Sequence, residues 1–353
     1  MANTSLKKVS ICIPVYNNLT QVKRCVSSIL SQHYHDFQII ITDDSDNDEI
    51  GDYVRNLPLP VAYFKNEKKL GPIHNWNRAL EEADSEYVKI FFSDDWFTDE
   101  DSLGKFVSLL EDNPEAGIAF SGSRQTPEQC LPDVNPDMTG KDWPEEYAAS
   151  QRPTQRSDTI KRVQRFNQRF PDEQAVLAEQ AASENQEEQP WERHASKAFI
   201  QNLKADWRNL FLGNQIGTPS AVIFRNTGVR FTPDSHWASD MFLYFDLLKQ
   251  NPHFAYTEEP LICVGLSKNQ YTHTFRDHDQ RKLQDYLHMY EKYDLRESAA
   301  CKQYLKEAFL LPYLQSPSVA EKCGLEKKAY AKELAAYFFD KKIMDYVRRI
   351  FRR

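Results

Sequence analysis

Paired carboxylates follow two apolar runs of the chain, and these pairs are the side chains best suited to chemistry. Asp43 and Asp44 come directly after one run, and Asp94 and Asp95 begin one residue beyond another. A single Asp after a strand is most often a turn residue or a helix cap. Two pairs at strand ends of one sheet favour a bound cation or a hydrogen-bonding ligand, because clustered carboxylates repel one another.

Hydrophobic periodicity predicts the elements that must position these pairs. Apolar runs predict strands at residues 9–15, 38–42, 61–64, 87–92 and 117–121. Helical periods predict a helix that begins at Leu19 and two more over residues 72–83 and 102–111. Strands separated by helices of this length pair in parallel, in an α/β sheet covered on both faces. Ligands of such a sheet bind at the carboxyl ends of the strands.

The alternation of predicted strands and helices stops near residue 124. Residues 124–206 are rich in Gln, Glu, Asp, Arg and Pro, which predicts a polar helical insertion. Further elements are expected as a strand that ends the run 211–224, a helix over 237–249 and short strands at 254–256 and 261–264. Beyond residue 277 the chain is helical in period throughout.

Three familiar phosphate or cation sites do not fit these residues. An EF-hand loop that begins at Asp44 would place Glu49 where glycine is needed and Arg55 where the bidentate Glu belongs. A dinucleotide site needs a glycine-rich first turn, and residues 14–21 (PVYNNLTQ) contain no glycine. The same absence excludes a P-loop.

Composition narrows the class of protein further. The 353 residues carry 44 Lys and Arg against 52 Asp and Glu, a net charge of −8, so we expect no nucleic-acid partner. Six cysteines show neither a CxxC motif nor a zinc spacing. No apolar run reaches the roughly 18–20 residues that span a bilayer, and the N-terminus lacks the features of a secretory signal. We therefore expect a cytoplasmic protein.

Five segments, in order and at sensible spacing, resemble the family 2 glycosyltransferases of the GT-A fold. The resemblance covers residues 8–125, with VSICIPVYNN, IIITDDSDND and the run that ends in SDDW, and resumes at GNQIGTPSAVIF and SDMFLYFDLL. It implies a mostly parallel sheet flanked by helices. The catalytic domain would cover residues 1–276, including the insertion 124–206, and residues 277–353 would form a helical C-terminal extension.

The resemblance also assigns residues to the nucleotide of a nucleoside-diphosphate sugar, UDP-linked by preference. The loop under the base would be formed by Pro14, Val15, Tyr16 and Asn17. Asp43 would accept the N–H of a uracil-like base, with Asp44 nearby. Asn66 and Asn75 are candidates for further contacts to the base or ribose.

Two further roles follow from the resemblance. Asp94 and Asp95 would be the DXD-type element that holds Mg²⁺ or Mn²⁺ against the two phosphates, where a hard cation neutralises the leaving group. Asp240 would be the general base of an inverting displacement. An Asp in a first helical turn is also favoured by the helix dipole alone, and Asp234 and Asp246 are nearby competitors. The segment 217–220 either shapes the acceptor pocket or is a turn into a strand.

The sequence departs from the family pattern at two places. Phe92 stands where relatives often carry an additional acid, and Ser267 stands where many carry a late His. Lys268 or His273 would then serve instead, or these are residues of a surface loop. The departures leave open an alternative, a degenerate transferase that binds a nucleotide sugar without turnover. A nucleotidyltransferase is disfavoured, because its first loop is normally rich in glycine and basic residues.

The last thirteen residues, 341–353, carry six basic side chains against Asp345. Their apolar residues recur at helical spacing, so the segment can lie on an anionic membrane surface, or dock on the domain or a second subunit. The sequence as a whole predicts an inverting, metal-dependent transferase of hexosyl or N-acetylhexosaminyl type. It would act on a hydroxyl of a glycan acceptor in bacterial surface polysaccharide assembly, at the inner face of the cell membrane where 341–353 reaches it.

Overall fold

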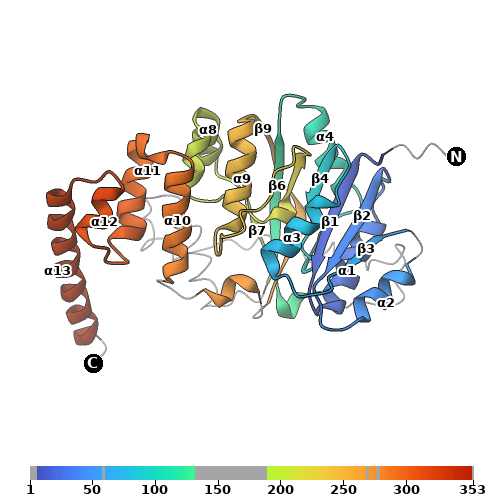
Figure 1. Cartoon of the computed structure of the whole chain (residues 1–353), viewed down its shortest axis with the longest axis horizontal. Helices are drawn as coiled ribbons and strands as arrows, with labels where there is room; N and C mark the ends of the chain where they lie inside the picture. Colours follow the sequence, from blue (N-terminus) through green and yellow to red (C-terminus); the bar gives the residue numbers. More distant parts are fainter. Residues whose placement is uncertain (1–5, 58–59, 132–188, 268–269, 276–278, 352–353) are drawn as a thin grey trace. The chain divides into compact units, whose positions relative to one another are not determined.

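The computed structural model describes most of the chain as two compact units. The described residues are 6–57, 60–131, 189–267, 270–275 and 279–351. The first unit comprises Met1–Trp207, Gly213–Ser235 and Ser239–Gln270, and the second comprises Arg208–Leu212, His236–Ala238 and Tyr271–Arg353. The expected α/β class with a helical C-terminal region is confirmed (Figure 1).

A single mixed sheet forms the centre of the first unit. Its strands are β1 (Val9–Val15), β2 (Phe37–Asp43), β3 (Ala62–Lys65), β4 (Tyr87–Ile90), β5 (Asp95–Phe97), β6 (Ile118–Pro127), β7 (Trp191–Arg193), β8 (Val222–Arg225) and β9 (Phe254–Leu266). They are ordered β3-β2-β1-β4-β8-β6-β9-β5, with β7 beside β6. The pairings give β1, β2, β3, β4, β6 and β9 one direction, whereas β5, β7 and β8 run against it.

Helices cover both faces of this sheet because its central strands are apolar on both sides. The first unit contains α1 (Leu19–Leu30), α2 (Glu49–Arg55), α3 (Pro72–Glu81), α4 (Ser102–Glu111), α8 (Lys197–Ala205) and α9 (Ser239–Gln250). All seven residues of β1 are buried. Ile11 and Ile13 belong to one core cluster with residues of α1, α2 and α4. Cys12 points to the other face, where its Sγ lies 3.2 Å from the Ala79 carbonyl of α3.

Two local features differ from the expected elements. Residues 254–256 and 261–264 were expected as separate strands, but they are the ends of the single strand β9, which bulges between them opposite Gly122. Gly122 is required there, because a Cβ would lie 2.4 Å from the Glu258 carbonyl oxygen. The 124–206 stretch also contributes to the sheet at both ends, through the last residues of β6 and through β7.

The second unit is helical and has an aromatic core. Its helices are α10 (Gln280–Lys292), α11 (Ala299–Tyr304), α12 (Pro317–Lys322) and α13 (Lys327–Phe351). Phe211, Tyr286 and Phe309 lie at its centre, with 3.9 Å between the ring centroids of Tyr286 and Phe309. Tyr330 anchors the start of α13, since its hydroxyl donates to the carbonyl oxygen of Leu310 at 2.9 Å. Among the described helices, none has the length and apolarity to cross a membrane.

Candidate active site

The carboxyl ends of the parallel strands place the predicted loops beside one another. Val15 at the end of β1 pairs with Asp43 of β2, and Asp43 pairs with Lys65 of β3. β4 lies on the other side of β1, where Ile90 pairs with Cys12. Pro14 and Val15 are buried at the last two positions of β1. The loops that follow β1 to β4 therefore meet at one edge of the sheet.

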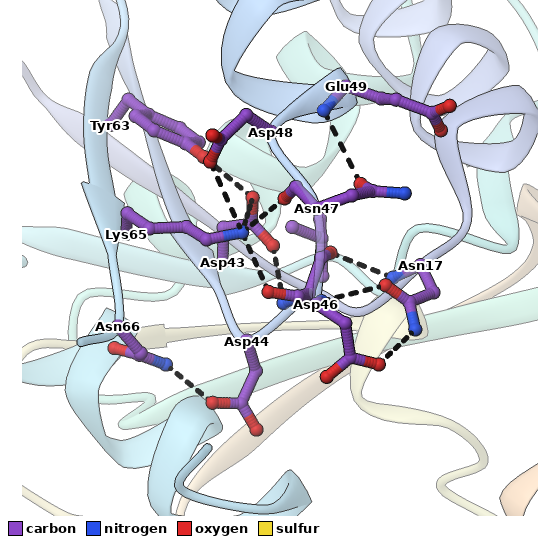
Figure 2. Close-up of polar contacts among 12 residues, drawn as sticks. Asn17, Asp43, Asp44, Asp46, Asn47, Asp48, Glu49, Tyr63, Lys65 and Asn66 are labelled. Atoms are coloured by element: carbon purple, nitrogen blue, oxygen red, sulfur yellow. Dashed lines mark hydrogen bonds and ion pairs between the residues drawn. The ribbon is translucent and has the colours of Figure 1, made fainter. Parts of the chain in front are cut away.

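Asp43 is fully buried and organises the loop after β2 (Figure 2). Its Oδ2 accepts hydrogen bonds from the Tyr63 hydroxyl at 2.6 Å and from Lys65 Nζ at 3.4 Å, and its Oδ1 accepts from the Ser45 amide at 2.8 Å. Burial and then the hydrogen bond to Asp43 raise the pKa of Tyr63. Both carboxylate oxygens of Asp43 are thus engaged within the protein.

Asp44 closes the loop that leads into α3. Its Oδ1 accepts from the Leu70 amide at 2.8 Å and from Asn66 Nδ2 at 3.0 Å, and its Oδ2 accepts from the Gly71 amide at 2.9 Å. Gly71 has φ 80, a conformation that favours glycine, and Pro72 follows as the first residue of α3. Asp44 thereby joins the end of β2 to the start of that helix.

Asn66 and Asn75 extend this network through the interior. Asn66 Nδ2 donates to Asn75 Oδ1 at 2.9 Å. Asn75 Nδ2 donates to the carbonyl oxygens of Val15 and Thr42, at 3.3 and 3.1 Å. Both side chains are buried and connect the ends of β1 and β2 to α3. The structure brings these two predicted site residues to the edge and gives their amides internal partners.

Tyr16 presents the exposed face of the same edge. Its ring is 43% exposed, and its hydroxyl donates to Asp46 Oδ2 at 3.0 Å. Asn17 adopts φ 49 and donates from Nδ2 to the same oxygen at 2.8 Å. These two bonds, the one from Asn17 first, lower the pKa of Asp46. Lys69 Nζ lies 3.9 Å from the centre of the Tyr16 ring.

Asp46 and Lys69 were not among the predicted site residues. Both lie next to predicted segments, in DDSDND and NEKKLG. Asp46 is the third acid of DDSDND, a run that was considered as a calcium loop and as part of the family resemblance without a role for Asp46 itself. Lys69 carried no signal in the sequence, because its place over Tyr16 depends on the fold of the loop after β3.

Asp94 and Asp95 have different surroundings despite being adjacent. Asp94 is partly exposed at the edge, and Gln270 Nε2 lies 3.4 Å from its Oδ2. Asp95 is 2% exposed, and its Oδ1 has no hydrogen-bond partner among the described residues. Burial raises the pKa of both carboxyls, and the Asp94 charge raises the pKa of Asp95 further. Phe92 packs against Trp76, with 4.9 Å between ring centroids.

Asp240 lies in the first turn of α9, partly exposed. Its Oδ2 accepts a hydrogen bond from Asn214 Nδ2 at 2.7 Å. Tyr244, one turn further along α9, donates its hydroxyl to the Gly217 carbonyl at 2.9 Å. Burial, and then the charge of Asp240, raise the pKa of Tyr244. The loop around Asn214 therefore packs directly on the start of α9.

The segment 214–220 connects Asp240 to the end of β4. At its far end the Ser220 hydroxyl accepts from the Phe92 amide at 2.9 Å, and the Ser220 carbonyl accepts from the buried Lys89 Nζ. Ser220 and Asn214 are six positions apart, so even an extended chain separates them by no more than about 22 Å. One segment of seven residues thus contacts both the first turn of α9 and the residues that follow β4.

Ser267, Lys268 and His273 were considered in connection with the late His of the family, and of these three only Ser267 has a described side chain. It is partly buried directly after β9. Lys268 and the side chain of His273 lie outside the described residues, and so do the side chains of 343–353.

The fold and this edge define an α/β protein with acidic side chains where the parallel strands end, and known proteins resemble it in sequence or in fold. Residues 10–136 match Glycosyl transferase family 2. The S. aureus TarS fragment 1–349, in complex with UDP-GlcNAc, has a similar fold, with a TM-score of 0.52 over 85% of this chain and 71% of that one, at 14% identity.

Two curated relatives match the same part of the sequence. The GalNAc(5)-diNAcBac-PP-undecaprenol beta-1,3-glucosyltransferase of Campylobacter jejuni is 31% identical over 118 residues, 32% of this chain and 37% of that protein. The abequosyltransferase RfbV of Salmonella typhimurium is 29% identical over 124 residues, 33% of this chain and 36% of that protein. The chain thus spans less than two fifths of each relative. These findings support a family 2 glycosyltransferase over residues 10–136, in agreement with the resemblance seen in the sequence.

The network around Asp44 generates a stability prediction. Asp44→Ala removes the acceptor of the Leu70 and Gly71 amides, and we expect the free energy of unfolding to fall by about 2–3 kcal/mol. Urea unfolding measures the loss, and hydrogen exchange should accelerate at those two amides. The control Asp112→Ala removes an exposed carboxylate at the end of α4. Equal stability of the two variants would contradict the assigned role.

Proposed function

We propose that this protein is an inverting glycosyltransferase that moves a sugar from a nucleoside diphosphate to a hydroxyl of a glycan acceptor. The observation that carries the proposal is the segment 214–220, which contacts Asp240 at one end and the end of β4 at the other. A transferase needs a proton acceptor near the group that binds the diphosphate. Asp240 and Asp94 supply these two groups.

The donor would be a UDP-linked hexose or N-acetylhexosamine. UDP-GlcNAc is bound by TarS, whose fold this chain shares. The base would lie against Tyr16 and Asn17, over the backbone of Pro14 and Val15, because the Tyr16 ring offers an exposed surface for stacking. Lys69 would leave that ring when the nucleotide binds. Asp43, Asp44, Asn66 and Asn75 would shape this pocket through the loops that they hold together.

Residues at the end of β4 fit a divalent cation with few protein ligands. No group of three His, Cys, Asp or Glu side chains that could hold a metal occurs among the described residues. Asp94 would therefore bind Mg²⁺ or Mn²⁺ together with phosphate oxygens and water, as Mg²⁺ sites commonly do. Asp95, whose Oδ1 has no hydrogen-bond partner among the residues that the structure describes, would be the second ligand. The cation would supply charge neutralisation for the leaving diphosphate.

Asp240 would accept the proton of the acceptor hydroxyl. The hydroxyl oxygen attacks the anomeric carbon as the bond from that carbon to the diphosphate oxygen breaks, and the nucleoside diphosphate leaves with the bonding electrons. A single displacement inverts the configuration at the anomeric carbon. Asp240 ends the step protonated and returns its proton to solvent.

Replacing Asp240 tests the base. We expect Asp240→Asn to lower kcat by about 10²–10⁴-fold, because the amide cannot accept the proton. UDP release is measured from UDP-glucose and UDP-N-acetylglucosamine, with octyl glucoside and octyl N-acetylglucosaminide as acceptors. Asp234→Asn, an exposed carboxylate six positions earlier, should keep the full rate. An undiminished rate in Asp240→Asn would show that the base is another group. UDP binding without turnover in the unmodified protein would favour the non-catalytic alternative.

Replacing Asp94 tests the cation. Calorimetry should show tighter UDP binding in MnCl₂ than in EDTA, and Asp94→Asn should remove most of that difference, because the amide is a weaker ligand. Asp36→Asn makes the same change just before β2, at the opposite edge of the sheet, and should leave the difference intact. Mn²⁺-independent binding by the unmodified protein would contradict a metal site.

We also propose that the transferase acts in polysaccharide assembly at an anionic membrane surface reached by residues 341–353. Phe338 and Phe339 of α13 are 43% and 66% exposed, and Lys341 and Lys342 follow them, also exposed. The six basic residues of this segment contrast with a net charge of −8 for the whole chain. Exposed aromatic rings beside basic side chains suit binding to anionic lipid.

Vesicle co-sedimentation tests this surface. The protein should pellet with phosphatidylglycerol-containing vesicles and much less with phosphatidylcholine alone, and Phe338→Ser with Phe339→Ser should reduce pelleting several-fold. Leu6→Ser changes an equally exposed apolar residue of the first unit and should have no effect. Equal pelleting with both lipids, or no change in the double variant, would overturn the proposed membrane contact.

A further inference from the structure

The side-chain amide of Asn214 donates to one oxygen of the Asp240 carboxylate, and the Met241 N–H donates to the other at 2.8 Å. Asn214 donates from Nδ2 to Asp240 Oδ2 at 2.7 Å, while its Oδ1 accepts from the amides of Ile216 and Gly217 at 3.1 and 3.2 Å. A flipped Asn214 would turn its NH₂ group toward two N–H donors and its oxygen toward a carboxylate. Its donor edge therefore stays directed at Asp240.

The turn that carries Asn214 is itself fixed from two elements. Arg193 of β7 donates from Nη2 to the Asn214 carbonyl at 2.7 Å. Tyr244 of α9 holds the Gly217 carbonyl from the side of the helix that carries Asp240. Gly217 has φ 99, which fits a tight turn. The amide at Asn214 is thus held in place before any substrate arrives.

We propose that Asn214 is a positioning residue that acts through Asp240, because it holds the carboxylate of that residue. The inference rests on the proposed role of Asp240 as general base. A base must lie about 2.6–3.2 Å from the atom whose proton it takes, and a misplacement of about 1 Å can cost about 10²-fold in rate. Asn214 need not touch the substrate for this effect.

A double-mutant cycle tests the proposal. Asn214→Ala is made alone and in the Asp240→Asn background, and kcat and KM are measured from UDP release with UDP-glucose or UDP-N-acetylglucosamine. We expect the single change to lower kcat about 10–100-fold while KM for the donor stays within about twofold. In the Asp240→Asn background the same change should leave the residual kcat within about twofold, because the group that Asn214 positions is absent. Glu291→Gln, an exposed change on α10, is the control and should keep kcat.

The outcomes separate this inference from the proposed function. An undiminished kcat in Asp240→Asn contradicts the base itself. A reduced kcat in Asp240→Asn, with a further and multiplicative loss from Asn214→Ala, overturns the positioning role alone. UDP binding by calorimetry verifies that each variant is folded.

Discussion

The structure depends on the need to satisfy carboxylates buried at the carboxyl edge of a parallel sheet. A buried carboxylate without donors is costly, so Asp43 and Asp44 must recruit amide, hydroxyl and ammonium groups from the loops around them. Asp43 takes its donors from β3 and the loop after β2, and Asp44 takes its donors from the loop before α3. Loops that are distant in sequence are thereby fixed together.

The residues at this edge fall into two groups, those that hold the loops together and those that remain exposed. Asp44, Asn66 and Asn75 bond to one another and to the backbone, and their contribution to binding is the shape of the loops. Tyr16 and Asp94 keep exposed surface at the same edge. Asp240 combines both properties, since it is partly exposed and yet oriented by Asn214.

The sequence predicted those elements that have a recognisable local pattern of apolar residues. Strands β1, β2 and β4 were predicted because burial on both faces leaves continuous apolar runs, and the order of five segments predicted the family whose model matches residues 10–136. Strands β5 and β7 have three residues each, too few to show a period, and the bulge in β9 made one strand resemble two. The partners of Asp44 and the contact of Asn214 with Asp240 depend on distant segments of the chain. No spacing along one sequence reveals such contacts.

The place of β8 has a consequence for how the chain folds. It lies between β4 and β6 in the sheet, yet it begins at Val222, long after both have been synthesised. Lys89 fastens it from within by donating to the Ser220 and Val222 carbonyls. During synthesis, the edges of β4 and β6 that pair with β8 therefore keep unpaired backbone N–H and C=O groups until β8 emerges from the ribosome. In the nascent chain such an edge can pair with the wrong strand. The central strand β8 covers the edge once it has been synthesised.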